Sequence, residues 1–413
     1  MTRSGSKRGY DDSDYYEDDY DYYDKKKKRR SRRRAGDVIS TIVIIAIIVI
    51  LLLLVADAGF REAVKNIFTP DVEGYREYPE WAVYDVQRVI TVTPQSSSFT
   101  MEYEIDIPKP EDIPNSTDPW LQDVRSIATN PSANEIKKGY PGNYTWFLWN
   151  ETDASSQRSL SITYSIRTES AVWDLEPSDS GTVADVPKWL ADKYGNRTKE
   201  EWKILPAHSQ IKSLSDQLTG GKITIYDKLK AIFDYLNENY DYVTARTGEP
   251  KYCYETYNLR SGDCDDQSVL FISLARAAGI PTWLEFGALY NQKQNSWGGH
   301  AWVRAYIPYY YGGGHVFIID IVNDHFLFRD AFKFSEWESD GNGSHLEDYY
   351  HSTGRNFNYD EYYNTLSMEV SSDTIRISES GRPVEETVPG FEGIVGVTAI
   401  LIAAVILRRK KRS

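Results

Sequence analysis

The sequence predicts an α+β fold in which a β-rich part precedes an α+β part, with an apolar segment near each terminus. Residues 99–107 and 160–166 alternate apolar and polar side chains, which is the period of half-buried strands. Residues 225–240 and 264–278 instead repeat apolar side chains at helical spacing. The chain has 413 residues, which leaves room for two or three domains.

Residues 1–37 form a charged cytoplasmic tail that we expect to be disordered. A run rich in Tyr and Asp is followed by a block of Lys and Arg, and such charge blocks without aliphatic residues do not fold. Residues 38–56 are long and apolar enough for a transmembrane anchor, and the basic block before them places the N-terminus in the cytoplasm. A cleaved signal peptide ending near Ala58 is the alternative, although its apolar region is normally shorter.

Residues 71–200 are predicted to form a β-rich extracytoplasmic domain. The two alternating runs described above lie in this range, and loops rich in Pro, Asn and Ser separate its apolar stretches. Antiparallel strands with one solvated face are typical of a β-sandwich. We therefore expect a β-sandwich-like domain before the α+β part.

A helix with a cysteine in its first turn opens the part of the chain on which the functional prediction depends. Asp263 is a good N-cap, and Asp266 follows three residues later as in a capping box. Gly279 is placed to end the helix. Because unpaired N–H groups and the positive end of the helix dipole surround Cys264, we expect the pKa of its thiol to be lowered.

A strand that begins at His300 supplies a candidate base. A Gly-rich hairpin at 308–314 leads from this strand into a second one that ends at Asp320. Folding the two strands against each other brings Asp320 near His300. Asp324 fits almost as well, because a register shift of two residues keeps the same face. A thiol, an imidazole and a carboxylate make a nucleophile, a base and an orienting group.

These motifs resemble the transglutaminase-like superfamily of papain-type cysteine enzymes. The resemblance rests on GDCDD at 262–266, LARAAGIP at 274–281, GHAWV at 299–303 and IIDI at 318–321. It implies a papain-like transglutaminase core within residues 201–369, with the cysteine on a helix N-terminus and the other two groups on antiparallel strands. It also implies a triad of Cys264 as nucleophile, His300 as base and Asp320 as the partner of the histidine.

The resemblance implies a thiol acyl-enzyme mechanism on amide bonds, as in a peptidase or amidase of cell-envelope peptides or proteins. Acyl transfer to an amine, as in a true transglutaminase, uses the same residues and is an alternative. Cys253 opens another one, because a disulfide with Cys264 can persist outside the cytoplasm. Such a bond would make a redox-gated or catalytically inactive surface module.

The C-terminal region mirrors the N-terminal one. Residues 370–389 are polar and weakly patterned, as in a stalk. Residues 390–413 contain an apolar run and a basic end directly after Pro389, and together they resemble the PGF-type sorting signal of archaeal surface proteins. This resemblance implies processing by an archaeosortase, and a plain second anchor is the alternative. The basic end predicts that both termini are cytoplasmic before any processing and that the middle lies outside.

The charge of the chain argues against a nucleic-acid partner. Its net charge is −14 at pH 7, and the middle is more acidic still because both ends are basic. Five N-x-S/T sequons agree with a glycosylated cell-surface protein, at Asn115, Asn143, Asn150, Asn196 and Asn342. The other histidines show no metal-ligand spacing, so we expect neither a metal nor a cofactor.

Overall fold

A computed structural model describes residues 75–96, 101–109, 113–114, 120–138, 144–244, 248–351 and 354–378. All of them lie in one compact unit. The predicted tail at 1–37 and the predicted membrane segments at 38–56 and 390–413 fall outside the described residues. Within the described ranges, no helix is long and apolar enough to cross a membrane.

Two antiparallel sheets form the β-rich part. Their strand orders are β19–β2–β8–β5–β4 and β18–β3–β7–β6. The strands are β2 (Trp81–Pro94), β3 (Met101–Pro108), β4 (Ile113–Pro114), β5 (Trp120–Asn130), β6 (Glu135–Lys138), β7 (Thr145–Ala154), β8 (Arg158–Glu169), β18 (Gly354–Arg355) and β19 (Phe357–Val370). Alternate residues of β2 and β8 are buried, as the period of a half-buried strand requires. The predicted strands at 99–107 and 160–166 are confirmed as β3 and β8.

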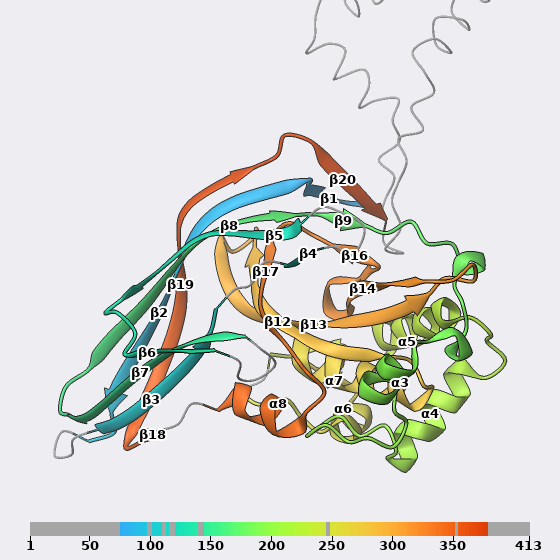
Figure 1. Ribbon diagram of the computed structural model, residues 1–413, viewed down its shortest axis with the longest axis horizontal. Helices are drawn as coiled ribbons and strands as arrows, with labels where there is room; N and C mark the ends of the chain where they lie inside the picture. The colour runs from blue at the N-terminus through green and yellow to red at the C-terminus, as the bar shows by residue number, and fades with distance from the viewer. Residues whose placement is uncertain are drawn as a thin grey trace, which may run out of the picture. The chain divides into compact units, whose positions relative to one another are not determined.

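The α+β part contains a five-stranded antiparallel sheet of order β15–β14–β13–β12–β17. Its strands are β12 (Thr282–Asn291), β13 (Ser296–Pro308), β14 (Gly314–Asp320), β15 (His325–Phe326) and β17 (Lys333–Glu338). The helices are α3 (Lys188–Tyr194), α4 (Ser209–Thr219), α5 (Ile225–Asn239), α6 (Cys253–Leu259), α7 (Cys264–Ala277) and α8 (Gly343–Tyr350). Figure 1 shows α4 to α7 gathered beside β12 and β13.

Short elements complete the described chain. Three pairs of short strands are β1 (Tyr75–Pro79) with β20 (Thr374–Ser378), β9 (Ala171–Val172) with β16 (Phe328–Arg329), and β10 (Asp241–Tyr242) with β11 (Ser261–Gly262). The 3₁₀ turns are η1 (Pro177–Asp179), η2 (Val183–Asp185) and η3 (Ile321–Asn323). The β10–β11 pair places the residues directly before the α7 N-terminus beside the end of α5.

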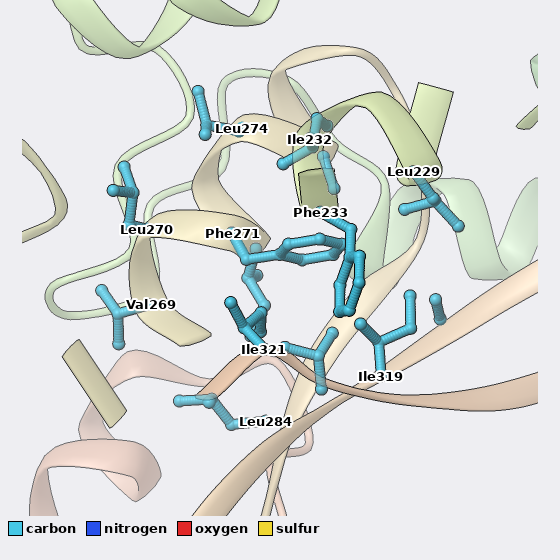
Figure 2. Packing of buried hydrophobic residues seen from close by; sticks show 14 of the residues in the cluster. Leu229, Ile232, Phe233, Val269, Leu270, Phe271, Leu274, Leu284, Ile319 and Ile321 are labelled. Carbon is cyan, nitrogen blue, oxygen red and sulfur yellow. The ribbon is translucent and has the colours of Figure 1, made fainter. Parts of the chain in front are cut away.

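Helix α7 is packed on every side. All residues from 266 to 277 are buried, because α4, α5 and α6 cover one side of the helix and β12 and β13 the other. Figure 2 shows side chains of α5, α7, the sheet and the turn η3 converging in this core, among them Leu229, Ile232, Phe233, Val269, Leu270, Phe271, Leu274, Leu284, Ile319 and Ile321. Only the first two residues of the helix, Cys264 and Asp265, remain partly exposed. Such packing holds the N-terminus of α7 in one place.

Two strand pairings connect segments that the sequence analysis assigned to different parts of the chain. β19 lies in the predicted α+β range 201–369 except for its last residue, Val370, and it pairs along its length with β2 of the β-rich part. β20 lies inside the predicted stalk 370–389 but pairs with β1. Both pairings join strands that are far apart in the sequence, and a local pattern does not specify such partners.

The β-rich and α+β parts share one hydrophobic cluster. The ring of Tyr84 on β2 lies 4.6 Å from that of Trp297 on β13, measured between centroids. Tyr164 on β8 lies 5.5 Å from Phe334 on β17 in the same way. Each part therefore covers apolar surface of the other.

Candidate active site

The N-terminus of α7 is built as predicted. Asp263 is the N-cap, and its side chain and that of Asp266 form a reciprocal capping box. At the other end, Gly279 adopts a φ of +85°, and the N–H of Ile280 donates to the carbonyl of Ala275. This is a Schellman arrangement, in which glycine takes the left-handed conformation at low cost. Cys264 is thus the first residue of a helix with both ends capped.

The thiol of Cys264 is half-buried and lies against β13. The backbone N–H of Ala301 donates to it, and Ala301 directly follows His300. The structure therefore brings the predicted nucleophile to the strand that carries the predicted base.

The expectation of a lowered pKa for Cys264 is wrong. Burial raises the pKa of the thiol, and the nearby carboxylates of Asp265 and Asp263 raise it further, although the Ala301 N–H acts in the opposite direction. The positive end of the α7 dipole is present, but burial of the thiol outweighs its effect on sulfur. The resting thiol is neutral.

His300 and Asp320 form a direct pair, as the hairpin prediction required. His300 lies on β13 and is buried, and its Nε2 is 2.8 Å from Oδ2 of Asp320 at the end of β14. Asp324 does not take this place. Its carboxylate instead accepts a hydrogen bond of 2.5 Å from Asn237 and lies 3.6 Å from Arg76.

The charge state of Asp320 determines which nitrogen of His300 carries a proton. Burial alone would raise the pKa of Asp320, but His300 and Lys333 outweigh burial and hold it well below its usual range. The ionised carboxylate accepts, so Nε2–H of His300 donates to it. The other ring nitrogen, Nδ1, is then the one able to accept a proton from a thiol.

Asn323 is a member of this group that the sequence prediction missed. Its Nδ2 donates to Oδ2 of Asp320 over 2.9 Å and lies 3.2 Å from Nε2 of His300. Asp320 is the N-cap of η3 and Asn323 is three residues later. Residues three apart on a 3₁₀ turn eclipse one another, so the spacing was a usable signal.

The surroundings of His300 are open on one side. Gly298 and Gly299 are exposed, and a Cβ added to either would meet nothing within 4 Å. Trp297 and Trp302, which flank this segment in the chain, are both buried in the core. Trp302 donates through Nε1 to Oε2 of Glu285 over 2.7 Å.

Three acidic side chains cluster at the start of α7. Single oxygens of Asp263, Asp265 and Asp266 lie within 4.8 Å of one another. Each has a partner in the protein, because Asp263 and Asp266 cap the helix, Asp266 also binds Lys251, and Asp265 accepts from the hydroxyl of Tyr350 over 3.0 Å. Burial and the neighbouring carboxylates raise the pKa of Asp265 to about 8. These contacts account for the cluster as a helix cap.

The disulfide that the sequence left open is not formed. Cys253 and Cys264 are both free, and Cys253 is fully buried at the start of α6. Its Sγ lies 3.9 Å from the carbonyl oxygen of Leu205 and contacts Ser273, so it is held away from the α7 N-terminus. The thiol of Cys264 is therefore available for chemistry.

Two segments of the chain match known family models. Residues 212–314 match the family model of the transglutaminase-like superfamily, so the chain contains a transglutaminase-like domain. The matched range contains Cys264 and His300 and ends before Asp320. Residues 388–410 match the PGF-CTERM motif, which indicates a protein anchored at the cell surface.

The chain is similar to individual known proteins over limited regions. It is 30% identical over 122 residues to the uncharacterized protein YebA of Bacillus subtilis, and the match covers 24% of this chain and 16% of YebA. A solved structure of a candidate cysteine protease from Cytophaga hutchinsonii aligns with a TM-score of 0.50 at 17% identity, over 72% of this chain and 94% of that one. This likeness shows a shared fold. A candidate protease from Parabacteroides distasonis reaches a TM-score of only 0.24 at 12% identity, over 68% of this chain and 47% of that one.

Proposed function

We propose that the transglutaminase-like domain is a cysteine peptidase or amidase that uses Cys264 as nucleophile, His300 as base and Asp320 as orienting group. The observation that carries the proposal is the 2.8 Å bond from Nε2 of His300 to Oδ2 of Asp320. This bond occupies Nε2, so Nδ1 is the nitrogen that can accept the proton of the thiol. The thiol lies against Ala301, the residue after His300 on β13.

The neutral resting thiol makes His300 a general base rather than half of a preformed ion pair. Nδ1 accepts the thiol proton as Sγ forms a bond to the amide carbon. His300 then gives that proton to the leaving nitrogen as the C–N bond breaks, and a thioester remains on Cys264. Water, deprotonated by His300, attacks the thioester, releases the acid and restores the thiol. Asp320 stabilises the imidazolium in both steps.

The developing oxyanion has a natural donor at the helix N-terminus. The N–H of Cys264 is in the first turn of α7 and so has no acceptor within the helix. A hydrogen-bond donor directed at the oxyanion lowers the activation free energy. Removing one such donor from a protease costs about 2.7–4 kcal/mol.

Hydrolysis is favoured over acyl transfer because water needs no binding site of its own. The Cytophaga hutchinsonii protein with the same fold is described as a cysteine protease candidate, which agrees with this choice. An amine acceptor would give a transglutaminase with the same residues.

The proposed place of action is the outside of the cell envelope. The PGF-CTERM motif supports surface anchoring after processing by an archaeosortase, and the predicted span at 38–56 supports a membrane-attached N-terminus. The sequon at Asn150 is exposed, as a glycosylated surface needs. Peptides or proteins of the envelope are therefore the proposed substrates.

A catalytically inactive surface module is the second candidate. The observation that favours it is the raised pKa of Cys264, because a neutral thiol is a weak nucleophile without help from His300.

One experiment separates the two candidates. The purified full-length chain is incubated with a peptide library, and cleavage is followed by mass spectrometry for the wild type, Cys264→Ala and the control Cys253→Ala. We expect turnover in the wild type and in Cys253→Ala, and none in Cys264→Ala with an unchanged melting temperature. Retained turnover in Cys264→Ala would falsify the proposal. Absence of both turnover and labelling by a thiol-directed acylating probe in the wild type would favour the inactive module.

A further inference from the structure

A lysine is buried directly behind His300 and Asp320. Lys333, the first residue of β17, has no exposed side-chain surface. Its Nζ donates to Oδ2 of Asp320 over 2.7 Å, lies 3.2 Å from Oδ2 of Asp330, and is 5.4 Å from the ring centroid of Trp302. An ammonium is strongly disfavoured in a protein interior unless carboxylates surround it. If this position only filled space in the core, an apolar side chain would be at least as stable as a buried ion pair.

The polar group extends beyond Lys333 to the edge of the β-rich part. Nδ1 of His325 lies 3.4 Å from Oδ2 of Asp330, and Nε2 of His325 is 2.7 Å from the hydroxyl of Tyr78 on β1. Burial and the charge of Lys333 lower the pKa of His325 to about 4, so this ring is neutral near pH 7. The charged members are Lys333, Asp320 and Asp330.

Lys333 supports the ionised state of both carboxylates. Burial alone would raise the pKa values of Asp320 and Asp330, and the ammonium of Lys333 is one of the charges that hold both below their usual range. Its Nζ lies 2.7 Å from Asp320 and 3.2 Å from Asp330. Without Lys333, neither buried carboxylate would face the ammonium that now pairs with it.

The hydrogen bonds to the Asp320 carboxylate are made to only one of its two oxygens among the described residues. His300, Asn323 and Lys333 all donate to Oδ2. The other oxygen, Oδ1, is buried and has no hydrogen-bond partner among the described residues. Three donors on one oxygen fix the rotation of the carboxylate so that this oxygen stays aimed at the imidazole.

We propose that Lys333 is a positioning residue for the Cys264–His300–Asp320 triad, keeping the carboxylate of Asp320 ionised and turned toward Nε2 of His300. The inference rests on the proposed function of that triad. In this role Lys333 acts through Asp320, to which its Nζ donates. It makes Nε2 of His300 the protonated nitrogen and Nδ1 the accepting one.

The test separates this role from simple neutralisation of buried charge. Lys333→Met removes the ammonium with little change in volume and leaves two buried carboxylates, so this variant is expected to be destabilised. Lys333→Met combined with Asp330→Asn also removes the second carboxylate that Lys333 contacts, and asparagine still accepts the N–H of Phe332 that Asp330 binds. Asp330→Asn alone is the matched control, because the Lys333–Asp320 pair remains.

For the full-length double variant we expect a melting temperature near that of the wild type and kcat about 10- to 100-fold lower with KM little changed, as for a misplaced reacting group. Asp330→Asn alone should keep most of its turnover. A double variant that folds and turns over at the wild-type rate would overturn the proposal, since Lys333 would then only neutralise Asp330.

Two readouts do not depend on a known substrate. Alkylation of Cys264 by iodoacetamide at pH 7 should be slower in the double variant than in Asp330→Asn, and equal rates would contradict the role. Spectra of ¹⁵N-histidine in the wild type should show the proton of neutral His300 on Nε2; a proton on Nδ1 would overturn the role even if no variant folds. Turnover retained in Cys264→Ala would instead show that the triad itself is not the catalyst.

Discussion

At the scale of single residues, the site depends on which carboxylate faces His300. The strand pattern left Asp320 and Asp324 open, and the structure pairs Asp320 with Nε2 of the ring while Asp324 is bound by Asn237. Asp324 also has a positive φ of 60°, which turns its backbone away from the strand that ends at Asp320. The two aspartates are therefore not equivalent in chemistry.

Replacing Asp320 by asparagine tests this difference. The neutral amide removes the negative charge that stabilises the imidazolium formed in the reaction, and it leaves Lys333 beside an uncharged group. We expect kcat to fall by about 10²–10⁴-fold, approaching the effect of the same change in a serine protease triad. The variant Asp324→Asn should stay close to the wild-type rate. Steady-state kinetics on a peptide that the wild type cleaves measure both rates. Equal losses of kcat in both variants would argue against Asp320 as the partner of His300.

Asp265 gives a prediction about pH. Its pKa is raised to about 8, so its carboxyl is neutral below that pH and negative above it, where it raises the pKa of Cys264. Alkylation rates of the wild type and Asp265→Asn should coincide below pH 7. Above pH 8 the variant should be faster, by up to about tenfold, which corresponds to one pKa unit.

Peptide mass spectrometry after timed iodoacetamide labelling from pH 6 to 10 measures this, with Asp241→Asn as a control on an exposed aspartate. A rate difference between the wild type and Asp265→Asn that is constant across pH would show that Asp265 acts sterically.

The raised pKa of Asp265 also has a consequence for stability, because the folded chain holds the carboxyl proton more tightly than the unfolded chain does. The free energy of unfolding should thus fall as pH rises from about 4 to 8 in the wild type, and less so in Asp265→Asn.

At the scale of elements, the site depends on how closely β17 approaches β12. Gly287 on β12 pairs with His300 on one side and with Ser335 on the other, and the register shifts at this point. A Cβ on Gly287 would lie 1.8 Å from the carbonyl oxygen of Phe334. Glycine at this position is what allows β17, with Lys333 at its start, to lie against the sheet.

Gly287→Ala should therefore push β17 outward. We expect the free energy of unfolding to fall by about 1–3 kcal/mol, as for other overpacked sites, and turnover to fall with it. Thermal unfolding followed by circular dichroism measures the first effect. Gly298→Ala, on the same sheet but with open space around the added Cβ, should change stability by less than about 0.5 kcal/mol. Similar losses in both variants would contradict this interpretation.

At the scale of the whole molecule, the β-rich part and the transglutaminase-like domain are tied together by shared packing. Tyr84 is fully buried against Trp297, which lies three residues before His300. β19 returns from the α+β part to pair with β2. The described chain should consequently unfold as one cooperative unit.

Tyr84→Ala tests this coupling. Removing a buried aromatic ring costs about 3–5 kcal/mol, and because the cluster is shared, the loss should lower the unfolding midpoint of both parts together. Far-ultraviolet circular dichroism and the exposure of Cys253 to alkylation report on the two parts, and their transitions should coincide. Tyr362→Ala, at a half-exposed position on β19, should leave both midpoints nearly unchanged. Separate transitions in the wild type would mean that the parts fold independently.

Local chemistry determined much of this protein from sequence alone. The α7 N-cap, its glycine C-terminus and the alternating strands all depend on residues a few positions apart, and they were predicted correctly. A hairpin also joins strands that are close in the sequence. Asp320 was therefore one of the two carboxylates expected near His300.

Only the tertiary structure decided the rest. The neutral state of Cys264, the separation of Cys253 from it, the choice of Asp320, and the positions of Asn323, Lys333 and β19 were outside the reach of local patterns. A lysine in a strand is normally exposed, so nothing in the sequence marked Lys333 as buried. The physical reason is common to all of them: pKa values and partners depend on desolvation and on charges that distant segments bring within a few ångströms, whereas sequence patterns record preferences of neighbouring residues.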